Sequence, residues 1–454
     1  MSANIIMCDY AKASHLYDLS LRKLIGLILL AVNLWIIPSA WAIPKIQSWN
    51  TPNGTKVLFV SAPELPMLDV RVVFNAGSAR EAKPGVALLT NSLLTQGAGQ
   101  WDVEQIAERL EAVGVTLSTG SLRDMSWLSL RTLIMQPALN TALETLTAIL
   151  GKPLFTAKDL KRLRNTMLVA LNQEEQKPGT MGTRALYKAI YGNHPYANYP
   201  TGTKEAVASI NRTDIQGHYN KYYVAKNAII ALVGAIDRKQ AEQIATQITS
   251  GLTTGATPPK LPKVPKLDRN QLELLDFPIT QSHIYIGQPC ITRNDPDYFP
   301  LYVGNHILGG SGLVSLLSKE IRERRGLSYS VSSALRPMQQ QGPFIMGLQT
   351  KNSQAKQALG LLMQILQRFV QTGPSAVELD AAKRNITGSF PLGIASNSAI
   401  AEYLSMIGFY NYPLDYLDTF IAKINAVTAE QIKAAFQRHI HPKHLVTVIV
   451  GPVQ

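Results

Sequence analysis

The sequence predicts an α+β protein made of two homologous domains, each a mainly antiparallel sheet with helices packed on one face. Three observations carry this prediction. A proline-rich segment over residues 251–267 divides the chain nearly in half, and both parts end in the same order of helix, turn and strand. Within the first part, strand-like and helix-like segments are segregated rather than strictly alternating, which is typical of an α+β fold.

The first 42 residues have the features of a secretory signal peptide. Arg22 and Lys23 precede an apolar run from Leu24 to Ile37, and the run Ala40-Trp41-Ala42 supplies small residues at the spacing that signal peptidase requires. A retained membrane anchor is the alternative, but roughly 14 apolar residues fall short of the ~20 that span a bilayer. We therefore expect cleavage after Ala42, a periplasmic location in a Gram-negative cell, and no stable membrane insertion of the mature chain.

Net charge and cysteine count narrow the function only a little. The 454 residues carry a net charge of +13, and removal of residues 1–42 takes away three basic and two acidic residues, which leaves +12. A basic protein can bind nucleic acid, an anionic membrane surface or an acidic peptide. Except around Lys319 to Arg325 the basic residues are spread along the chain, and no nucleic-acid motif occurs, so we expect no nucleic-acid partner. Cys8 lies in the signal peptide, so Cys290 is the one cysteine of the mature chain and no internal disulfide can form.

The first domain is expected over residues 43–250. Lys56 to Val60 and Leu68 to Phe74 are rich in β-branched residues and flank a turn-like segment, so they are predicted to be paired strands. Asp102 is a plausible N-cap for a helix with apolar residues at three- and four-residue spacing. The remaining expected elements are helices over residues 85–96, 103–113, 137–150 and 157–173, and strands over 115–119 and 127–133.

The second domain is expected over residues 268–454, after a stiff linker over residues 251–267 that holds four prolines. Its end repeats the end of the first domain. A helix-like stretch leads into the strand Ala228 to Gly234 in the first domain, and the stretch from Gln431 to His439 leads into Leu445 to Gly451 in the second. This repetition indicates an internal duplication.

Two segments carry a resemblance to a known family. The run from Val70 to Ser78 precedes the helix 85–96, and Leu308-Gly309-Gly310 precedes the run from Arg322 to Val331. In these segments and in its order of elements, the chain resembles the pitrilysin/insulinase metallopeptidases (inverzincins), especially the processing-peptidase branch, over about the whole mature chain. The resemblance implies two domains that face each other around a cavity, clamshell fashion, and chains that pair to enclose a peptide.

The zinc motif of the active relatives is missing from this sequence. Those relatives carry H-x-x-E-H, in which two histidines four residues apart share one metal ion and a glutamate acts as general base. The matching residues here are Leu88, Leu89, Thr90, Asn91 and Ser92. The third ligand of the family, a glutamate, would fall at Val169 or Ala170. The sequence therefore predicts no catalytic residue, no metal ligand and no autonomous peptidase activity in this chain.

The resemblance also implies a substrate-binding pair in the second domain, Arg322 and Tyr329. In relatives such a pair binds the peptide and stabilises the charge that develops on the scissile carbonyl, and a guanidinium and a phenol are both suitable donors. On a helical wheel, Leu313, Leu316, Leu317 and Ile321 form an apolar stripe with Arg322 roughly opposite. The alternative is a solvated, cationic helix end followed by a half-buried strand residue.

Three other constellations are given structural interpretations. The loop Gly309 to Gly312 lacks the lysine of a phosphate-binding P-loop. Glu174 and Glu175 are adjacent and diverge on a helix, which makes them a poor acid/base pair. His439, His441 and His444 form an H-x-H-x-x-H cluster, but with no carboxylate or cysteine nearby they are interpreted as surface histidines rather than a metal centre.

The function expected from these observations is that of a non-catalytic, substrate-binding subunit of an exported heterodimeric zinc metallopeptidase. Zinc and the general base would belong to a paralogous partner subunit with H-x-x-E-H, and Arg322 and Tyr329 would complete its site on a peptide substrate. The alternative is a purely structural or peptide-binding homodimer without a role in proteolysis. An independent hydrolase is not supported, because no Ser/His/Asp or Cys/His arrangement is evident.

Overall fold

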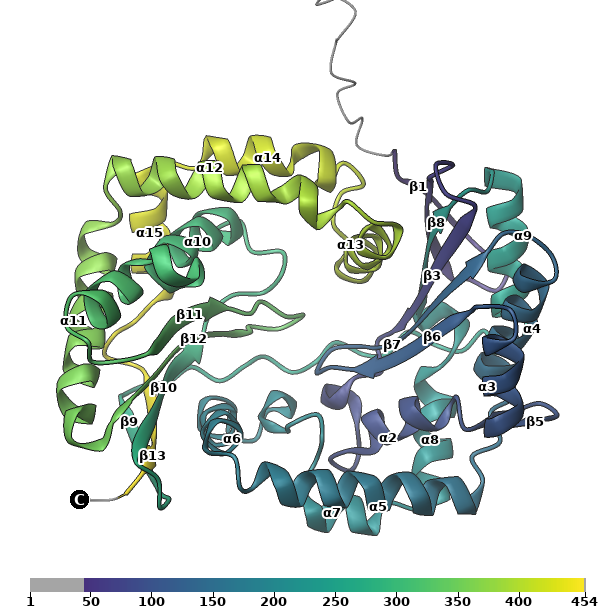
Figure 1. Cartoon of the computed structure of the whole chain (residues 1–454), viewed down its shortest axis with the longest axis horizontal. Helices are drawn as coiled ribbons and strands as arrows, with labels where there is room; N and C mark the ends of the chain where they lie inside the picture. The colour runs from purple at the N-terminus through teal and green to yellow at the C-terminus, as the bar shows by residue number, and fades with distance from the viewer. Residues whose placement is uncertain (1–44, 453–454) are drawn as a thin grey trace, which may run out of the picture. The chain divides into compact units, whose positions relative to one another are not determined.

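The computed structural model describes residues 45–452, so the signal peptide and Cys8 lie outside the described residues (Figure 1). Within them, two mixed sheets bear helices, which confirms the predicted α+β class. No helix in residues 45–452 combines the length and the apolar character that a membrane crossing demands. Cys290 is a free, buried thiol.

The first sheet has six strands in the order β1-β2-β8-β3-β7-β6. Only the contact between β2 and β8 is parallel, and all other neighbours are antiparallel. The strands are β1 (Gln47–Asn50), β2 (Lys56–Ser61), β3 (Met67–Phe74), β6 (Thr116–Ser121), β7 (Ser126–Leu133) and β8 (Ala228–Gly234).

The second sheet has five strands in the order β11-β12-β10-β13-β9, with a single parallel contact between β9 and β13. The strands are β9 (Gln271–Asp276), β10 (Gln281–Pro289), β11 (Ser330–Leu335), β12 (Pro343–Lys351) and β13 (Val446–Gly451).

The two sheets have the same topology. Read from β9, the second order β9-β13-β10-β12-β11 matches β2-β8-β3-β7-β6 of the first, including the position of the parallel pair. The last glycine of β8, Gly234, lies opposite Ser61, and the last glycine of β13, Gly451, lies opposite Asp276. These registers make Val57 equivalent to Leu272 and Phe59 equivalent to Leu274, as an internal duplication requires.

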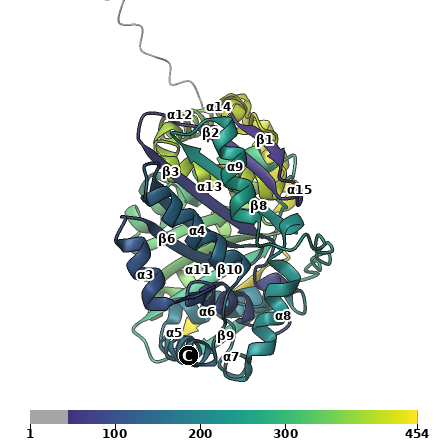
Figure 2. The ribbon, with the colours of Figure 1, turned by 90° about the vertical axis from the view of Figure 1, so that its right-hand side faces the viewer.

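Helices α2 (Val86–Leu93), α4 (Ala138–Gly151) and α9 (Arg238–Thr249) of the first part lie on its sheet. Figure 2 shows α4 and α9 in front of these strands, and α2 contacts β6 and β7. As predicted, Asp102 caps α3, with a reciprocal side-chain bond to Gln105. The helices are α2 (Val86–Leu93), α3 (Val103–Glu111), α4 (Ala138–Gly151), α5 (Ala157–Glu174), α6 (Pro178–Tyr191), α7 (Lys204–Ser209), α8 (Arg212–Tyr222) and α9 (Arg238–Thr249), and a two-residue pair, β4 (Gly97–Ala98) with β5 (Trp101–Asp102), precedes α3.

The helices of the second part include two π-helical turns near the segment that resembles the substrate-binding region. The helices are α10 (Tyr298–Asn305), α11 (Ala355–Thr372), α12 (Ala376–Gly393), α13 (Asn397–Tyr410), α14 (Tyr416–Ala426) and α15 (Ala429–His439), and the π-helical turns are η4 (His306–Gly310) and η6 (Ser318–Glu323).

Each part donates one helix to the other part's sheet. Helix α6 packs on β10 and β13, and α13 packs on β8, β3 and β2, so each sheet is also covered on its second face (Figure 1). Glycines permit both contacts: a Cβ on Gly182 would lie 2.4 Å from the ring of Tyr285, and one on Gly408 would lie 2.6 Å from Ile229. The exchange ties the two parts together through apolar burial.

Polar contacts and the linker reinforce this connection. Buried Asp124 accepts hydrogen bonds from Tyr196 (2.6 Å), from Tyr410 of α13 (3.1 Å) and from the backbone N–H of Gln339 (2.8 Å). Residues 251–267 form neither helix nor strand, and the linker residue Leu261 is buried against α6. The prolines therefore keep the segment extended while its apolar side chains fix it to the core.

Candidate functional site

Helix α2 carries the residues that replace the zinc motif. Leu88 and Ser92 are half-buried, whereas Asn91, at the position of the general base, is fully buried. The Asn91 amide donates to the carbonyls of Gly120 (2.9 Å) and Trp127 (3.3 Å), and its oxygen accepts from the Tyr223 hydroxyl (3.1 Å). These three hydrogen bonds connect α2 to β6, to β7 and to the residue that follows α8.

The position of the third ligand lies on α5, which packs against α2. Val169 and Ala170 occupy it, and both are exposed. Leucine, asparagine, serine, valine and alanine offer neither imidazole, thiolate nor carboxylate, so this donor set does not fit the zinc ion of the family. A zinc-hydrolase site at this position is excluded by its chemistry.

A buried carboxylate that the sequence interpretation overlooked lies beside this helix. Glu81 Oε2 accepts from the backbone N–H groups of Gly85 (3.0 Å) and Ala87 (3.2 Å) at the start of α2, while Oε1 is buried without a partner. Burial raises the pKa of Glu81 to about 8, against the opposing effect of the two N–H donors. An acidic residue a few positions before a helix is the sequence feature that could have predicted this contact, because a carboxylate is stabilised by the N–H groups at a helix start.

The substrate-binding candidates Arg322 and Tyr329 are brought together by the turn after η6. Buried Leu317 and Ile321 fix η6 to the core, and the backbone N–H of Gly326, a residue with φ of +61°, donates to the carbonyl of Arg322 (3.0 Å). The chain then reverses into β11, and the Arg322 guanidinium carbon lies 5.0 Å from the centroid of the Tyr329 ring. This is a cation–π distance.

Both members of the pair are available for a ligand. The Tyr329 side chain is 84% exposed, which rules out the half-buried alternative, and Arg322 forms no ion pair within residues 45–452. The neighbouring cations differ, because Arg324 and Arg325 are both bound to Glu320, at 2.6 and 2.7 Å. Among the arginines of this helix end, Arg322 is therefore the one whose charge is not neutralised locally.

One detail of the predicted apolar stripe is wrong. Leu317 and Ile321 are buried as expected, but Leu313 is 58% exposed. The stripe assumed a continuous α-helix. Leu313 instead lies in a separate 3-10 turn (Gly312–Val314), which extended Ser315 separates from the π-helical turn η6, so α-helical spacing does not apply.

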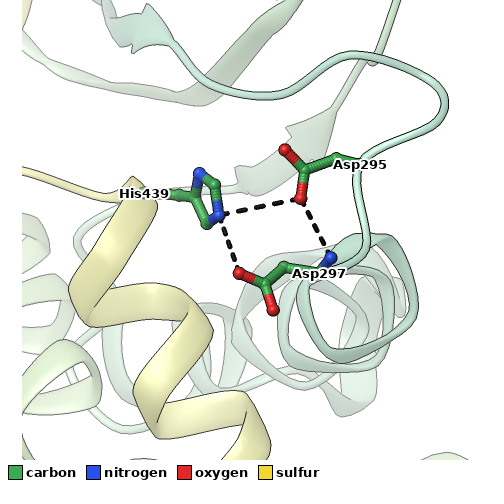
Figure 3. Close-up of side chains that lie close together, drawn as sticks. All are labelled: Asp295, Asp297 and His439. Carbon is green, nitrogen blue, oxygen red and sulfur yellow. Dashed lines mark hydrogen bonds and ion pairs between the residues drawn. The ribbon is translucent and has the colours of Figure 1, made fainter.

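A second constellation joins residues far apart in the sequence. His439 Nε2 lies 2.8 Å from a carboxylate oxygen of Asp297 and 3.8 Å from Asp295 (Figure 3). Arg438 donates two hydrogen bonds to Asp297. The sequence interpretation placed no carboxylate or cysteine near these histidines, and that premise is wrong: Asp297 contacts His439, and Cys290 lines the same cavity as the three histidines. The separation of 142 positions between Asp297 and His439 concealed the contact.

Comparisons with known proteins agree with the resemblance. Two family models match the chain, Insulinase (Peptidase family M16) over residues 56–204 and Peptidase M16 inactive domain over residues 209–386. A crystal structure of a peptidase M16 inactive domain from Pseudomonas fluorescens matches with a TM-score of 0.87 and 39% identity, and the match covers 90% of this chain and 98% of that one.

Two curated relatives extend the comparison. A protein of Helicobacter pylori named non-peptidase homolog YmxG is 26% identical over 95% of this chain and 99% of its own length. A probable mitochondrial-processing peptidase subunit beta of Arabidopsis thaliana is 21% identical over 90% of this chain and 79% of its own length.

Proposed function

The chain belongs to the insulinase (M16) peptidase family, and from this premise we propose that it is the non-catalytic, substrate-binding subunit of an exported heterodimeric zinc metallopeptidase. The observation that carries the proposal is the pair formed by half-buried Arg322 and exposed Tyr329. This pair differs from the residues at the zinc position of the family. There, Leu88 and Leu89 are apolar, and the Asn91 amide is bound to the backbone carbonyls of Gly120 and Trp127. In the pair, two hydrogen-bond donors lie side by side, and within residues 45–452 neither side chain donates to a partner.

In this proposal the chemistry is divided between two chains. A paralogous partner with H-x-x-E-H supplies zinc and the general base, and this chain supplies hydrogen-bond donors for the substrate. The Arg322 guanidinium and the Tyr329 hydroxyl bind the peptide carbonyl and stabilise the negative charge that develops on its oxygen. One relative is named a probable mitochondrial-processing peptidase subunit beta, which supports an assembly of this kind.

Export is part of the proposal and is supported by the sequence of residues 1–42. The order of basic residues, apolar run and Ala-Trp-Ala predicts a mature chain that begins at Ile43 in the periplasm. N-terminal sequencing of the protein from the periplasmic fraction tests it, and a chain that keeps Leu24 to Ile37 and sediments with membranes would contradict it.

The proposed division of roles is tested with the two chains purified separately and together. The partner is taken as the paralogue with H-x-x-E-H encoded in the neighbouring reading frame, and the substrate is a quenched-fluorescence peptide library. We expect no hydrolysis by this chain alone, even with added Zn²⁺, and hydrolysis by the complex. Peptide hydrolysis by this chain alone that is lost with a chelator would contradict the proposal.

Arg322 is tested in the same complex against a matched control. Arg322→Ala removes a charge-assisted bond to the substrate, so KM is expected to rise roughly 10–100-fold. Arg324→Ala removes the same charge two residues away, but its side chain is already bound to Glu320, so KM should hardly change. Equal effects of the two substitutions would show that only the local charge matters, and unchanged cleavage in both would favour the structural homodimer.

A further inference from the structure

Three histidines gather at one cavity of the second part. His439 ends α15, and His441 and His444 follow in the loop that leads to β13. All three line a cavity of about 390 Å³ whose other walls come from the linker at Pro265 to Leu267 and from the end of β10. The ring centroids of His441 and His444 lie 6.0 Å apart.

The loop backbone is fixed while two of the rings are exposed. The His441 N–H donates to the Gln288 side chain (2.8 Å), and the His444 N–H donates to the carbonyl of His441 (2.8 Å). The imidazoles of His441 and His444 are exposed at the cavity and are not bound to a carboxylate within residues 45–452. They can therefore reorient toward a common ligand without a change in the fold.

His439 has the arrangement that orients an imidazole for metal binding. Asp297 is held by two bonds from Arg438, and its oxygen lies 2.8 Å from His439 Nε2. Because a carboxylate only accepts, the contact with Asp297 engages Nε2, and Nδ1 is the nitrogen left for a metal ion. The Nδ1 atom is directed away from both carboxylates (Figure 3). A carboxylate behind the non-ligating nitrogen is the usual outer partner of a metal-binding histidine.

Two carboxylates lie next to one of the three imidazoles. Asp297 pairs with Arg438 and His439, and Asp295 lies 3.8 Å from His439. Imidazole nitrogen is a borderline donor that suits Zn²⁺, Cu²⁺ and Ni²⁺ rather than Mg²⁺ or Ca²⁺.

We propose that His439, His441 and His444 bind one divalent transition-metal ion, with Zn²⁺ as the best match, and that Asp297 orients His439 for this purpose. This site lies in the second part of the chain, on α15 and the loop after it, and so is separate from α2 where the family places its zinc. It does not depend on the proposed role in proteolysis.

The test is Zn²⁺ titration of the tag-free, metal-stripped mature chain by competition with a chromophoric chelator. We expect one equivalent of tightly bound Zn²⁺, and for Co²⁺ in its place the absorption of a tetrahedral site. The double variant His441→Ala/His444→Ala should abolish tight binding. Asp297→Asn should weaken binding by about 10–100-fold, the usual effect of losing an outer carboxylate.

His283→Ala is the matched control, because this histidine lies on β10 and does not line the cavity. The Zn²⁺ affinity of this variant should equal that of the wild type. Far-UV circular dichroism of each metal-free variant shows that the fold is intact. If the wild type bound Zn²⁺ no more tightly than His441→Ala/His444→Ala, the three residues would be adventitious surface histidines and the proposal would be wrong. Binding unaffected by Asp297→Asn would overturn the assignment of His439 as a ligand.

Discussion

The two parts of the molecule share one strand order, but they differ in what covers two equivalent strands, β2 in the first part and β9 in the second. In the first part, β2 is flanked by β1 and covered by α9, and Val57 and Phe59 are completely buried. In the second part, β9 is an edge strand, and the equivalent Leu272 and Leu274 are 63% and 50% exposed. A duplicated fold therefore preserves backbone pairing, while burial at equivalent positions is decided by the added elements.

The two parts also differ in the helical segment that leads into strand β6 in the first part and strand β11 in the second. In the first part α3 is a regular helix closed by Gly114, and Val115 leads into β6. In the second part the corresponding turn, η6, is π-helical, is closed by Gly326, and leads into β11. Irregular helical turns are frequent at functional sites, and this one presents Arg322 beside Tyr329.

The largest expected effect comes from truncating the equivalent apolar residues of β2 and β9. Phe59→Ala removes a fully buried ring and is expected to lower the free energy of unfolding by about 3–5 kcal/mol. Leu274→Ala removes a side chain that is half-exposed and should cost less than about 1 kcal/mol. Urea denaturation of both variants measures the difference. Equal costs would mean that β9 is covered in solution.

The carboxylates at the start of the two first helices should respond to pH in opposite directions. Glu81 has a pKa of about 8 in the folded protein and 4.5 in the unfolded chain. Its contribution to stability is therefore present below pH 4.5 and is lost as the pH rises toward 8. The free energy of unfolding should fall by about a few kcal/mol at most over this range. Bonds from Arg438 and His439 lower the pKa of Asp297, so its contribution is present above pH 3.8 and is lost as the pH falls.

The measurement is the free energy of unfolding across this pH range for Glu81→Gln and Asp297→Asn. Glu81→Gln keeps an acceptor for the two N–H groups and should flatten the decline between pH 4.5 and 8. Asp297→Asn should flatten the acidic limb and leave the higher range unchanged. A decline toward pH 8 that survives Glu81→Gln would show that another group causes it.

A smaller effect is expected at the position that replaced the general base. Asn91→Leu leaves the Gly120 carbonyl and the Tyr223 hydroxyl without their partner and should cost about 1–3 kcal/mol in thermal or chemical unfolding. Asn305, at the end of α10, makes the similar contact in the second part by accepting from Ser333 (2.8 Å). Asn305→Leu should cost a comparable amount, and a neutral result at Asn91 would remove the structural explanation for its amide.

Local sequence patterns were sufficient for the elements that are defined by their own residues. The strands at Lys56 and Leu68, the cap at Asp102 and the duplicated ending all appear close to the expected places, because β-branched runs and capping residues act over a few positions. The expected boundaries 43–250, 251–267 and 268–454 remain predictions.

The contacts between distant residues were not accessible in the same way. Amphipathic α6 and α13 show an apolar face, but periodicity does not say which sheet that face covers, so their exchange between the two parts was not expected. The Asp297–His439 contact joins the start of α10 to the end of α15, which are far apart in the sequence. The Arg322–Tyr329 pair was found from a family resemblance, and the structure adds its contact distance and exposure.

The most direct measurement of the central claim is kcat for the intact two-chain complex that carries Tyr329→Phe. The substitution removes one hydroxyl from a side chain that is 84% exposed, so the free energy of unfolding should change by less than about 0.5 kcal/mol. If the hydroxyl stabilises the oxyanion at the partner's zinc site, kcat should fall by ~10²–10³ while the complex elutes at the wild-type size. An unchanged kcat in an intact complex would contradict the account and leave this chain a structural subunit.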